Sequence, residues 1–388
     1  MKRKGISRIV LVSIIVAVII AAGVAYMFVA SNQNQGTNQG TTPTQKIRIS
    51  GAGSTFVAYF MQTAAYHYAQ KYPVEVDYAS IGSGGGIKQF MEKTVDFGAS
   101  DAPLPRSQWE KAEDALHIPV VIGAVVVVYN IPEIPSNIRL KFTGQIVADM
   151  YLGKITKWND PALVSLNPQL ANIDKPITVV HRSDGSGTTY VFTQYLSVVS
   201  KEWAEKVGYD TSVNWPAPNK IGGKGNEGVA GVVQKTPYTI GYVEYTYAVK
   251  NNIPYGMLDN PSTGEFVEPT IQTIAKTVDY IALTLPRGDE DWSKVSIIVS
   301  FFELAKTNKN LSGAYPVVSF VYVFIYKELS KVPGMTKEKA KALVEFLRWL
   351  VKDGQQYAEP LYYIPLPQSV TNLALETLSM AKFQGSSL

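Results

Sequence analysis

The feature that most constrains the fold is one pattern that occurs four times: a short apolar run, a loop of small residues, and then apolar residues at helical spacing. The loops are residues 51–56 (GAGSTF), 81–86 (IGSGGG), 97–103 (FGASDAP) and 181–189 (HRSDGSGTT). The short apolar runs predict strands, so the chain alternates strands and helices, as an α/β protein with mainly parallel sheets does. Such proteins bind ligands beyond the carboxyl ends of their strands, and we therefore expect the four loops to share one site.

The loop at residues 181–189 has the composition of an anion site. Its glycines allow backbone N–H groups to converge at a helix start, and Ser186 or Thr188 can cap that helix while offering a hydroxyl donor. Arg182 supplies a positive charge in a fixed fork, and Asp184 is close enough in sequence to orient or neutralise it. The alternative for Arg182 and Asp184 is a surface ion pair without a ligand, worth less than about 1 kcal/mol.

Asp101 is the residue that separates one anion from another. A carboxylate repels an anion unless the anion donates a proton, as phosphate does near neutral pH and fully ionised sulfate does not. If Asp101 faces the shared site, the ligand is phosphate; if it only caps the turn that follows it, this argument fails. Any one of these loops also suits an ordinary strand-to-helix turn, but four of them favour a ligand. The uncharged donors are the hydroxyls of Ser54, Thr55, Ser83, Ser186 and Thr188.

Charge and composition exclude several classes of function. The chain has 36 basic and 32 acidic residues, but four basic residues, at positions 2, 3, 4 and 8, precede the first apolar run. The rest of the chain is neutral, so we expect no nucleic-acid partner. There is no cysteine, which excludes disulfides and thiolate chemistry, and the three histidines are far apart in sequence. We therefore expect no metal site and no cofactor.

The sequence does not predict an enzyme. No Gly-x-Ser-x-Gly element surrounds Ser54, Ser83 or Ser186. No phosphate-binding Gly-x4-Gly-Lys-Ser/Thr loop occurs either, since Lys224 lacks a following hydroxyl residue. His181 lies at a strand end, where a structural role is more common than a catalytic one, so we assign no catalytic residue. An extracellular phosphatase that uses the same loops for its product is the alternative from the enzyme class.

The N-terminal segment predicts a membrane anchor. An uncharged apolar run from Ile9 to Ala30 follows the basic residues 1–8 and exceeds the roughly 20 residues that span a bilayer. The positive-inside rule leaves residues 1–8 in the cytoplasm and everything after the run outside the cell. Residues 31–45 (SNQNQGTNQGTTPTQ) are polar and uncharged, as in a flexible linker. Cleavage near Ala30, as in an exported signal segment, is the alternative.

Further segments outline the rest of the fold. Residues 119–129 form a nearly continuous β-branched run, which predicts a central strand and a crossover into a second lobe. Apolar residues predict strands at 239–249 and 315–325. Helical spacing predicts helices at 109–116 and, with a clear amphipathic pattern, at 337–352.

In order along the chain, these motifs resemble those of a known family, the extracytoplasmic phosphate-binding proteins that supply the ABC phosphate transporter. The matching segments are GAGSTF (51–56), IGSGGGIKQF (81–90), VDFGASDAPL (95–104), YLGKITKWNDP (151–161), HRSDGSGTT (181–189), GGKGNEGVAGVVQKTPYTIGYVEY (222–245), YPVVSF (315–320) and PLP (365–367). One motif would be weak evidence, but the ordered set is specific. Two features depart from the family: Gly84 stands where a second serine is common, and no cysteine is available for lipid attachment.

The resemblance implies a two-lobe α/β fold of the periplasmic-binding-protein-like type II class, with mixed, mainly parallel sheets, a hinge cleft and a preceding transmembrane helix. Lobe I would comprise residues 46–126 and 260–388, and lobe II residues 127–259. The chain would be a membrane-tethered receptor, expected to be a monomer, that binds inorganic phosphate outside the cell and delivers it to the permease subunits of the ABC transporter. Cleavage of the anchor would make it secreted or periplasmic.

The family's ligand contacts carry over by position to both predicted lobes. With Ser54 added from the first loop, the expected phosphate-binding residues are Ser54, Thr55, Phe56 (main chain), Ser83, Asp101, Arg182, Asp184 as the partner of Arg182, Ser186, Gly187 and Thr188. Two alternatives lie outside the enzyme class. One is a receptor for another tetrahedral oxyanion, such as sulfate or molybdate, and the other is an anchored sensor whose closed form docks on a membrane partner.

Overall fold

The computed structural model of the chain describes residues 46–112, 114–281, 285–307 and 309–388. Helices and strands alternate through most of these residues, so the predicted α/β class is confirmed. The strands are β1 (Ile47–Gly53), β2 (Val74–Ser80), β3 (Phe97–Ser100), β4 (Ala115–Asn130), β5 (Lys141–Phe142), β6 (Thr178–Arg182), β7 (Lys220–Gly223), β8 (Thr239–Glu244), β9 (Met257–Asp259), β10 (Phe266–Val267), β11 (Val318–Tyr326), β12 (Lys382–Phe383) and β13 (Ser386–Ser387).

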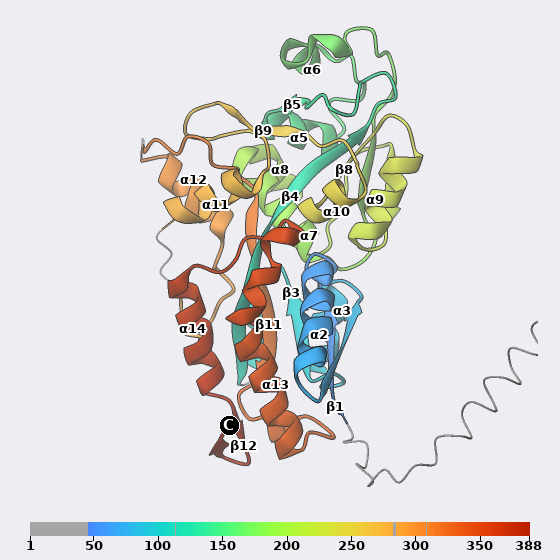
Figure 1. The fold of residues 1–388 in the computed structure, drawn as a ribbon. Coiled ribbons are helices and arrows are strands. Elements are labelled where there is room, and N and C mark those ends of the chain that lie inside the picture. Colours follow the sequence, from blue (N-terminus) through green and yellow to red (C-terminus); the bar gives the residue numbers. More distant parts are fainter. Residues whose placement is uncertain (1–45, 113, 282–284, 308) are drawn as a thin grey trace, which may run out of the picture. The chain divides into compact units, whose positions relative to one another are not determined.

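The helices connect and cover these strands (Figure 1). They are α2 (Ala58–Lys71), α3 (Ser83–Met91), α4 (Arg106–Ala112), α5 (Gly144–Tyr151), α6 (Pro161–Leu166), α7 (Gly187–Val199), α8 (Lys201–Lys206), α9 (Gly225–Lys235), α10 (Tyr245–Lys250), α11 (Ile271–Tyr280), α12 (Ile297–Ala305), α13 (Lys337–Leu350) and α14 (Gln368–Ser379). Helices α2 and α3 follow β1 and β2, and α7 and α9 follow β6 and β7, so successive strands of the two parallel groups are connected through helices, as in βαβ units.

Eight strands form one sheet in the order β2-β1-β3-β11-β4-β8-β6-β7. Strand β1 runs parallel to β2 and β3, and β6 runs parallel to β7 and β8. Three pairings between these two groups are antiparallel: β3 with β11, β11 with β4, and β4 with β8. The sheet is therefore mixed and mainly parallel, as the sequence predicts. The carboxyl ends of each parallel group carry the loops of small residues.

Strand β4 joins the two parallel groups. Its residues 115–124 pair with β11 and its residues 125–130 pair with β8 (Figure 1). All of its residues except the last are buried, which explains the unbroken apolar and β-branched run. Its register with β11 shifts next to Pro119, a bulge that accommodates a residue without an N–H donor. The predicted central strand at 119–129 is thus confirmed, with an earlier start.

Some predicted element boundaries are wrong. The helix expected at 109–116 ends at Ala112, because residues 115 and 116 already pair with β11. The strand expected at 239–249 ends at Glu244, whose carboxylate accepts the N–H of Thr246 and thereby starts α10. The strand expected at 315–325 and the helix expected at 337–352 are confirmed as β11 and α13, with small differences at their ends.

Helix α3 begins at Ser83, inside a segment that the sequence predicts as a loop. It forms despite three consecutive glycines because these glycines allow contacts that a side chain would prevent. A Cβ atom on Gly86 would overlap the Cα atom of Gly53 and lie 2.6 Å from the carbonyl oxygen of Ala52. A Cβ atom on Gly84 would lie 2.9 Å from the Cα atom of Gly185. The start of α3 therefore packs directly against the backbone of two of the predicted site loops.

Several predictions concern residues or boundaries that the structure leaves untested. The basic segment 1–8, the apolar run 9–30 and the linker 31–45 lie outside the described residues. Within the described ranges, no helix has both the length and the apolar character to cross a membrane. Residues 46–388 pack as one unit, and the division into lobe I (46–126 and 260–388) and lobe II (127–259) stays a prediction.

Gly86→Ala tests the close packing of α3. We expect it to destabilise the fold by about 1–3 kcal/mol, because the new methyl group meets backbone atoms that cannot move aside. Gly231→Ala is the matched control, since it is also inside a helix, α9, but its added Cβ meets no atom within 4 Å. It should stabilise the protein by about 0.5–1 kcal/mol. Chemical denaturation measures both changes, and equal effects of the two substitutions would contradict the packing argument.

Candidate anion-binding site

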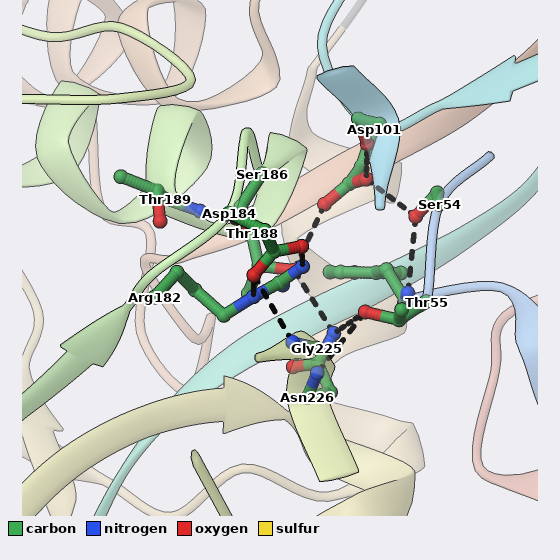
Figure 2. Close-up of polar contacts among 12 residues, drawn as sticks. Ser54, Thr55, Asp101, Arg182, Asp184, Ser186, Thr188, Thr189, Gly225 and Asn226 are labelled. Carbon is green, nitrogen blue, oxygen red and sulfur yellow. Dashed lines mark hydrogen bonds and ion pairs between the residues drawn. The ribbon is translucent and has the colours of Figure 1, made fainter. Parts of the chain in front are cut away.

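The loops at the carboxyl ends of the parallel strands meet at one place, as the sequence predicts (Figure 2). Ser54 follows β1, Asp101 follows β3, and Ser83 is the first residue of α3. From the second parallel group, Arg182 is the last residue of β6 and Thr188 lies in the first turn of α7. All five residues are buried. The parallel arrangement of the strands thus concentrates polar side chains that are distant in sequence.

The carboxylate of Asp101 lies among three hydroxyl donors. Its Oδ1 accepts from Ser54 Oγ at 2.6 Å and from Ser83 Oγ at 2.7 Å, and its Oδ2 accepts from Thr188 Oγ1 at 3.1 Å. Burial raises the pKa of Asp101 above its ordinary value, although the two serine hydrogen bonds and the charge of Arg182 act in the opposite direction. Asp101 therefore faces the shared site, and its carboxylate binds residues of other loops rather than capping the turn that follows it.

Arg182 and Asp184 form a buried, two-pronged ion pair. Arg182 Nε donates to Asp184 Oδ1 at 2.8 Å, and Nη2 donates to Oδ2 at 2.6 Å (Figure 2). The side chain of Arg182 is only 1% exposed, which excludes the surface-pair interpretation. Although burial acts to raise it, the hydrogen bonds and charge of Arg182 lower the pKa of Asp184. Asp184 Oδ1 also accepts the N–H of Gly225, at 3.0 Å, so the pair is tied to the start of α9.

Gly187 and Thr188 bring the start of α7 against the Asp101 carboxylate. A Cβ atom on Gly187 would overlap Asp101 Oδ1 and lie 2.6 Å from Ser83 Oγ, so only glycine fits at this position. The hydroxyl of Thr188 donates to Asp101 and accepts from Arg182 Nη1 at 3.4 Å. Asp101 and Arg182 are thus connected through a single neutral hydroxyl.

Ser186 and Phe56 each form a hydrogen bond within their own loop. Ser186 Oγ accepts the N–H of Thr189 at 3.0 Å and caps α7, the role expected from the sequence. The N–H of Phe56 donates to Ser54 Oγ at 3.0 Å, while its carbonyl oxygen accepts the hydroxyl of Tyr363 at 2.6 Å. All ten predicted residues therefore lie in the loops and helix starts that converge at this site.

Asn226 and Tyr242 belong to the cluster, although neither is among the residues expected from the sequence. Asn226, the second residue of α9, donates to the hydroxyls of Thr55 and Thr188 (Figure 2). The hydroxyl of Tyr242 accepts the N–H of Arg182 at 3.1 Å. The sequence does contain a signal for these two residues. In the segment 222–245, a glycine-containing turn leads from a strand into a helix, as in the other four loops.

Glu244 is a buried carboxyl group at the end of β8, next to the cluster. Its Oε1 accepts the N–H and the hydroxyl of Thr246, both at 3.0 Å, and its Oε2 lies 3.4 Å from the hydroxyl of Tyr363. Burial raises the pKa of Glu244 well above its ordinary value, against the effect of these hydrogen bonds. Folding therefore makes Glu244 retain its proton to higher pH than an exposed glutamate does.

The cluster has the chemistry of an anion receptor, with hydroxyls, backbone N–H groups and one guanidinium. Within the described part of the chain, no group of three or more histidine, aspartate or glutamate residues is placed to hold a metal ion. His181 is half-buried and stacks on Trp215, and its Nδ1 lies 2.9 Å from the carbonyl oxygen of Arg182. Burial lowers the pKa of His181. This histidine thus packs against an aromatic ring and its own strand.

Comparison with known proteins finds relatives along most of the chain. A model of the PBP superfamily domain matches residues 31–353. The phosphate-binding protein PstS of Xylella fastidiosa is 41% identical over 352 residues, which cover 88% of this chain and 90% of the relative. The phosphate-binding protein PstS of Methanocaldococcus jannaschii is 37% identical over 394 residues, which cover 98% of this chain and 96% of the relative.

A solved structure shares the fold at lower sequence identity. It is the crystal structure of a phosphate ABC transporter substrate-binding protein from Clostridium perfringens with bound phosphate. It aligns with a TM-score of 0.57 and 20% identity over 82% of this chain and 100% of that one. Together with the superfamily match, this likeness supports the predicted periplasmic-binding-protein-like fold of type II.

Glu244→Gln tests the buried carboxyl group through the pH dependence of stability. Because its pKa is raised on folding, the native state keeps a proton that the unfolded state loses as the pH rises above about 4.5. The free energy of unfolding of the wild type should therefore fall relative to Glu244→Gln, by up to about 1.4 kcal/mol per pH unit, until the pH passes the folded pKa. Chemical denaturation at several pH values measures this difference.

Two results would bear on the Glu244 argument. Glu345→Gln, at an exposed position of α13, controls for the loss of one carboxylate and should change the stability by less than about 0.5 kcal/mol. A difference between Glu244→Gln and the wild type that stays constant from pH 4.5 upward would contradict a raised pKa.

Proposed function

Since the chain belongs to the PBP superfamily and, within it, to the PstS phosphate-binding proteins, we propose that it binds inorganic phosphate outside the cytoplasm and delivers it to an ABC permease. The relatives are named for phosphate binding and not for a reaction, so the chain is a binding protein and not an enzyme. The phosphate-bound structure of an ABC transporter substrate-binding protein with the same fold supports this assignment.

The observation that carries the proposal is the position of the Asp101 carboxylate. A carboxylate has about four acceptor positions, and three of them are taken by the hydroxyls of Ser54, Ser83 and Thr188. The remaining position favours a ligand that donates a proton, because a fully ionised anion would place like charges together. Phosphate brings this proton near neutral pH, and sulfate does not. Asp101 would therefore select phosphate over sulfate and molybdate.

The ligand would be surrounded mainly by dipoles. Arg182 would supply the one positive charge, held in place by Asp184, and the N–H groups at the start of α7 would point at the anion. The proposed set is the one expected from the sequence: Ser54, Thr55, Phe56, Ser83, Asp101, Arg182, Asp184, Ser186, Gly187 and Thr188.

We propose that binding closes a hinge between the predicted lobes, residues 46–126 with 260–388 and residues 127–259. The closed form would be held by contacts such as the hydrogen bond from Gly84 N–H to the carbonyl oxygen of Gly185, at 2.9 Å. Strand β4 would serve as one connection, because its two halves pair with strands of different lobes. The chain segment 256–269 would be the second connection.

The receptor would work at the outer face of the cell membrane as a monomer. The apolar run 9–30 would anchor it in a single pass, and the linker 31–45 would allow it to reach the permease. Removal of the run by a signal peptidase would instead release the receptor from the membrane.

Arg182→Ala tests the proposed phosphate site. In calorimetric titration of protein stripped of anions, we expect the wild type to bind one phosphate and to bind sulfate far more weakly. Arg182→Ala should raise the Kd for phosphate at least about 100-fold, because it leaves the carboxylates of Asp101 and Asp184 uncompensated. Arg106→Ala, at an exposed position, should leave the Kd unchanged. Phosphate binding by Arg182→Ala with wild-type affinity would refute the proposed role.

Asp101→Asn tests how the site selects its ligand. The amide removes the like charge that opposes a fully ionised anion, so the ratio of the sulfate Kd to the phosphate Kd should fall at least about tenfold. Asp174→Asn, which changes an exposed aspartate, should keep the wild-type ratio. Competition titrations of both anions measure the ratio. An unchanged ratio in Asp101→Asn would mean that the carboxylate does not select the ligand by accepting its proton.

A further inference from the structure

Asn226 connects Thr55, Thr188 and the end of β8, and both ends of its side-chain amide and its backbone N–H form hydrogen bonds. It is fully buried at the second position of α9. Its backbone N–H donates to Thr55 Oγ1 at 3.1 Å, which satisfies one of the free N–H groups of the helix start. Its Nδ2 donates to Thr55 Oγ1 at 2.8 Å and to Thr188 Oγ1 at 3.1 Å. Figure 2 shows Asn226 beside both threonines.

The orientation of the Asn226 amide follows from its neighbours. Its Oδ1 accepts the backbone N–H of Glu244 at 2.9 Å. The opposite orientation would place the amide NH₂ against that N–H, so that two donors would face each other. The NH₂ group must therefore point toward the hydroxyls of Thr55 and Thr188.

This orientation determines what the Thr55 hydroxyl can do. A threonine hydroxyl has one hydrogen to donate and two lone pairs that accept. Both lone pairs of Thr55 Oγ1 are taken, by the backbone N–H and the Nδ2 of Asn226. Among the described residues, the structure gives the Thr55 hydrogen no acceptor. Thr55 can therefore act toward a ligand only as a donor.

Both lone pairs of the Thr188 hydroxyl are occupied as well. Its Oγ1 accepts from Arg182 Nη1 and from Asn226 Nδ2, which leaves its hydrogen for Asp101 Oδ2. Without the Asn226 donor, the Thr188 hydroxyl would have a free lone pair and could turn. Asn226 thus fixes the direction of two hydroxyls that belong to different segments of the chain.

We propose that Asn226 is a positioning residue for phosphate, which holds Thr55 as an obligatory donor to the anion and Thr188 as an obligatory donor to Asp101. This inference rests on the proposed phosphate-binding function. It also assigns Asn226 a role in retention of the ligand. Asn226 lies in residues 127–259 and Thr55 in residues 46–126, so their hydrogen bonds form only when the proposed lobes close.

Loss of the Asn226 contacts should affect the two rates of phosphate binding differently. Contacts that form only after closure hold the ligand without guiding its entry, so their loss should change the rate of phosphate dissociation and leave the association rate nearly unchanged. The test is stopped-flow and calorimetric measurement of phosphate binding by the full chain, as wild type, Asn226→Ala and Asn226→Asp. We expect Asn226→Ala to raise the Kd about tenfold, mostly through faster dissociation.

Asn226→Asp provides the sharper variant, because it keeps the size of the side chain and the acceptor for the Glu244 N–H. Its second oxygen accepts from Thr55 and Thr188, so the Thr188 hydroxyl turns away from Asp101 and the Thr55 hydroxyl away from the ligand, and a negative charge is added. We expect the Kd to rise about 100-fold or more. Asn167→Ala removes a buried asparagine whose side chain bonds to the backbone of Lys141 and Leu163, and it should leave the phosphate Kd unchanged.

A double-mutant cycle separates positioning from a general loss of structure. If Asn226 acts mainly through the Thr55 hydroxyl, Asn226→Ala should raise the Kd less in a Thr55→Val background than in the wild type, with less than about a threefold increase remaining through Thr188. A wild-type Kd in Asn226→Ala or Asn226→Asp, or the same increase with and without Thr55→Val, would overturn the inference while phosphate binding stands. A wild-type protein that does not bind phosphate would overturn the proposed function and this inference with it.

Discussion

The charge balance around Arg182 is the constraint on which the rest of the site depends. Its guanidinium is buried and already paired with Asp184, and Asp101 adds a second carboxylate nearby. Formal charges alone therefore do not favour an anion here, and a buried charge without compensation would be costly. In the proposed phosphate site, uncharged donors would therefore supply most of the stabilisation, and the ligand itself would bring a proton to Asp101.

Close backbone packing makes this arrangement possible. Gly187 lets the first turn of α7 approach the Asp101 carboxylate, and Gly84 lets α3 approach Gly185 in the loop before α7. Each approach is too close for a side chain. The glycines of the loops are thus needed for close approach and not for flexibility. They allow N–H and hydroxyl groups from separate helices to reach the same site.

The sequence predicted the shared site because its evidence is local. A strand followed by small residues and a helix can be recognised in a few positions, and the ligand chemistry of Asp101 follows from its charge alone. The contacts of Asn226 with Thr55 and of Glu244 with Tyr363 could not be found in this way, since these pairs are distant in sequence and are brought close only by the fold. The predicted loop at the start of α3 is wrong for a related reason: tertiary packing overrides the low helix propensity of its glycines.

Three helix starts provide what the formal charges do not. The first turns of α3, α7 and α9 converge on the cluster, and the N-terminal end of a helix carries a partial positive charge. In α9 the first two N–H groups bind Asp184 and Thr55, so this helix stabilises the partner of Arg182 and at the same time directs a hydroxyl. Partial charges fixed in the backbone need no counterions and do not titrate. A site built from them distinguishes anions by the hydrogen bonds that they can donate and accept, and therefore by their protonation state more than by their net charge.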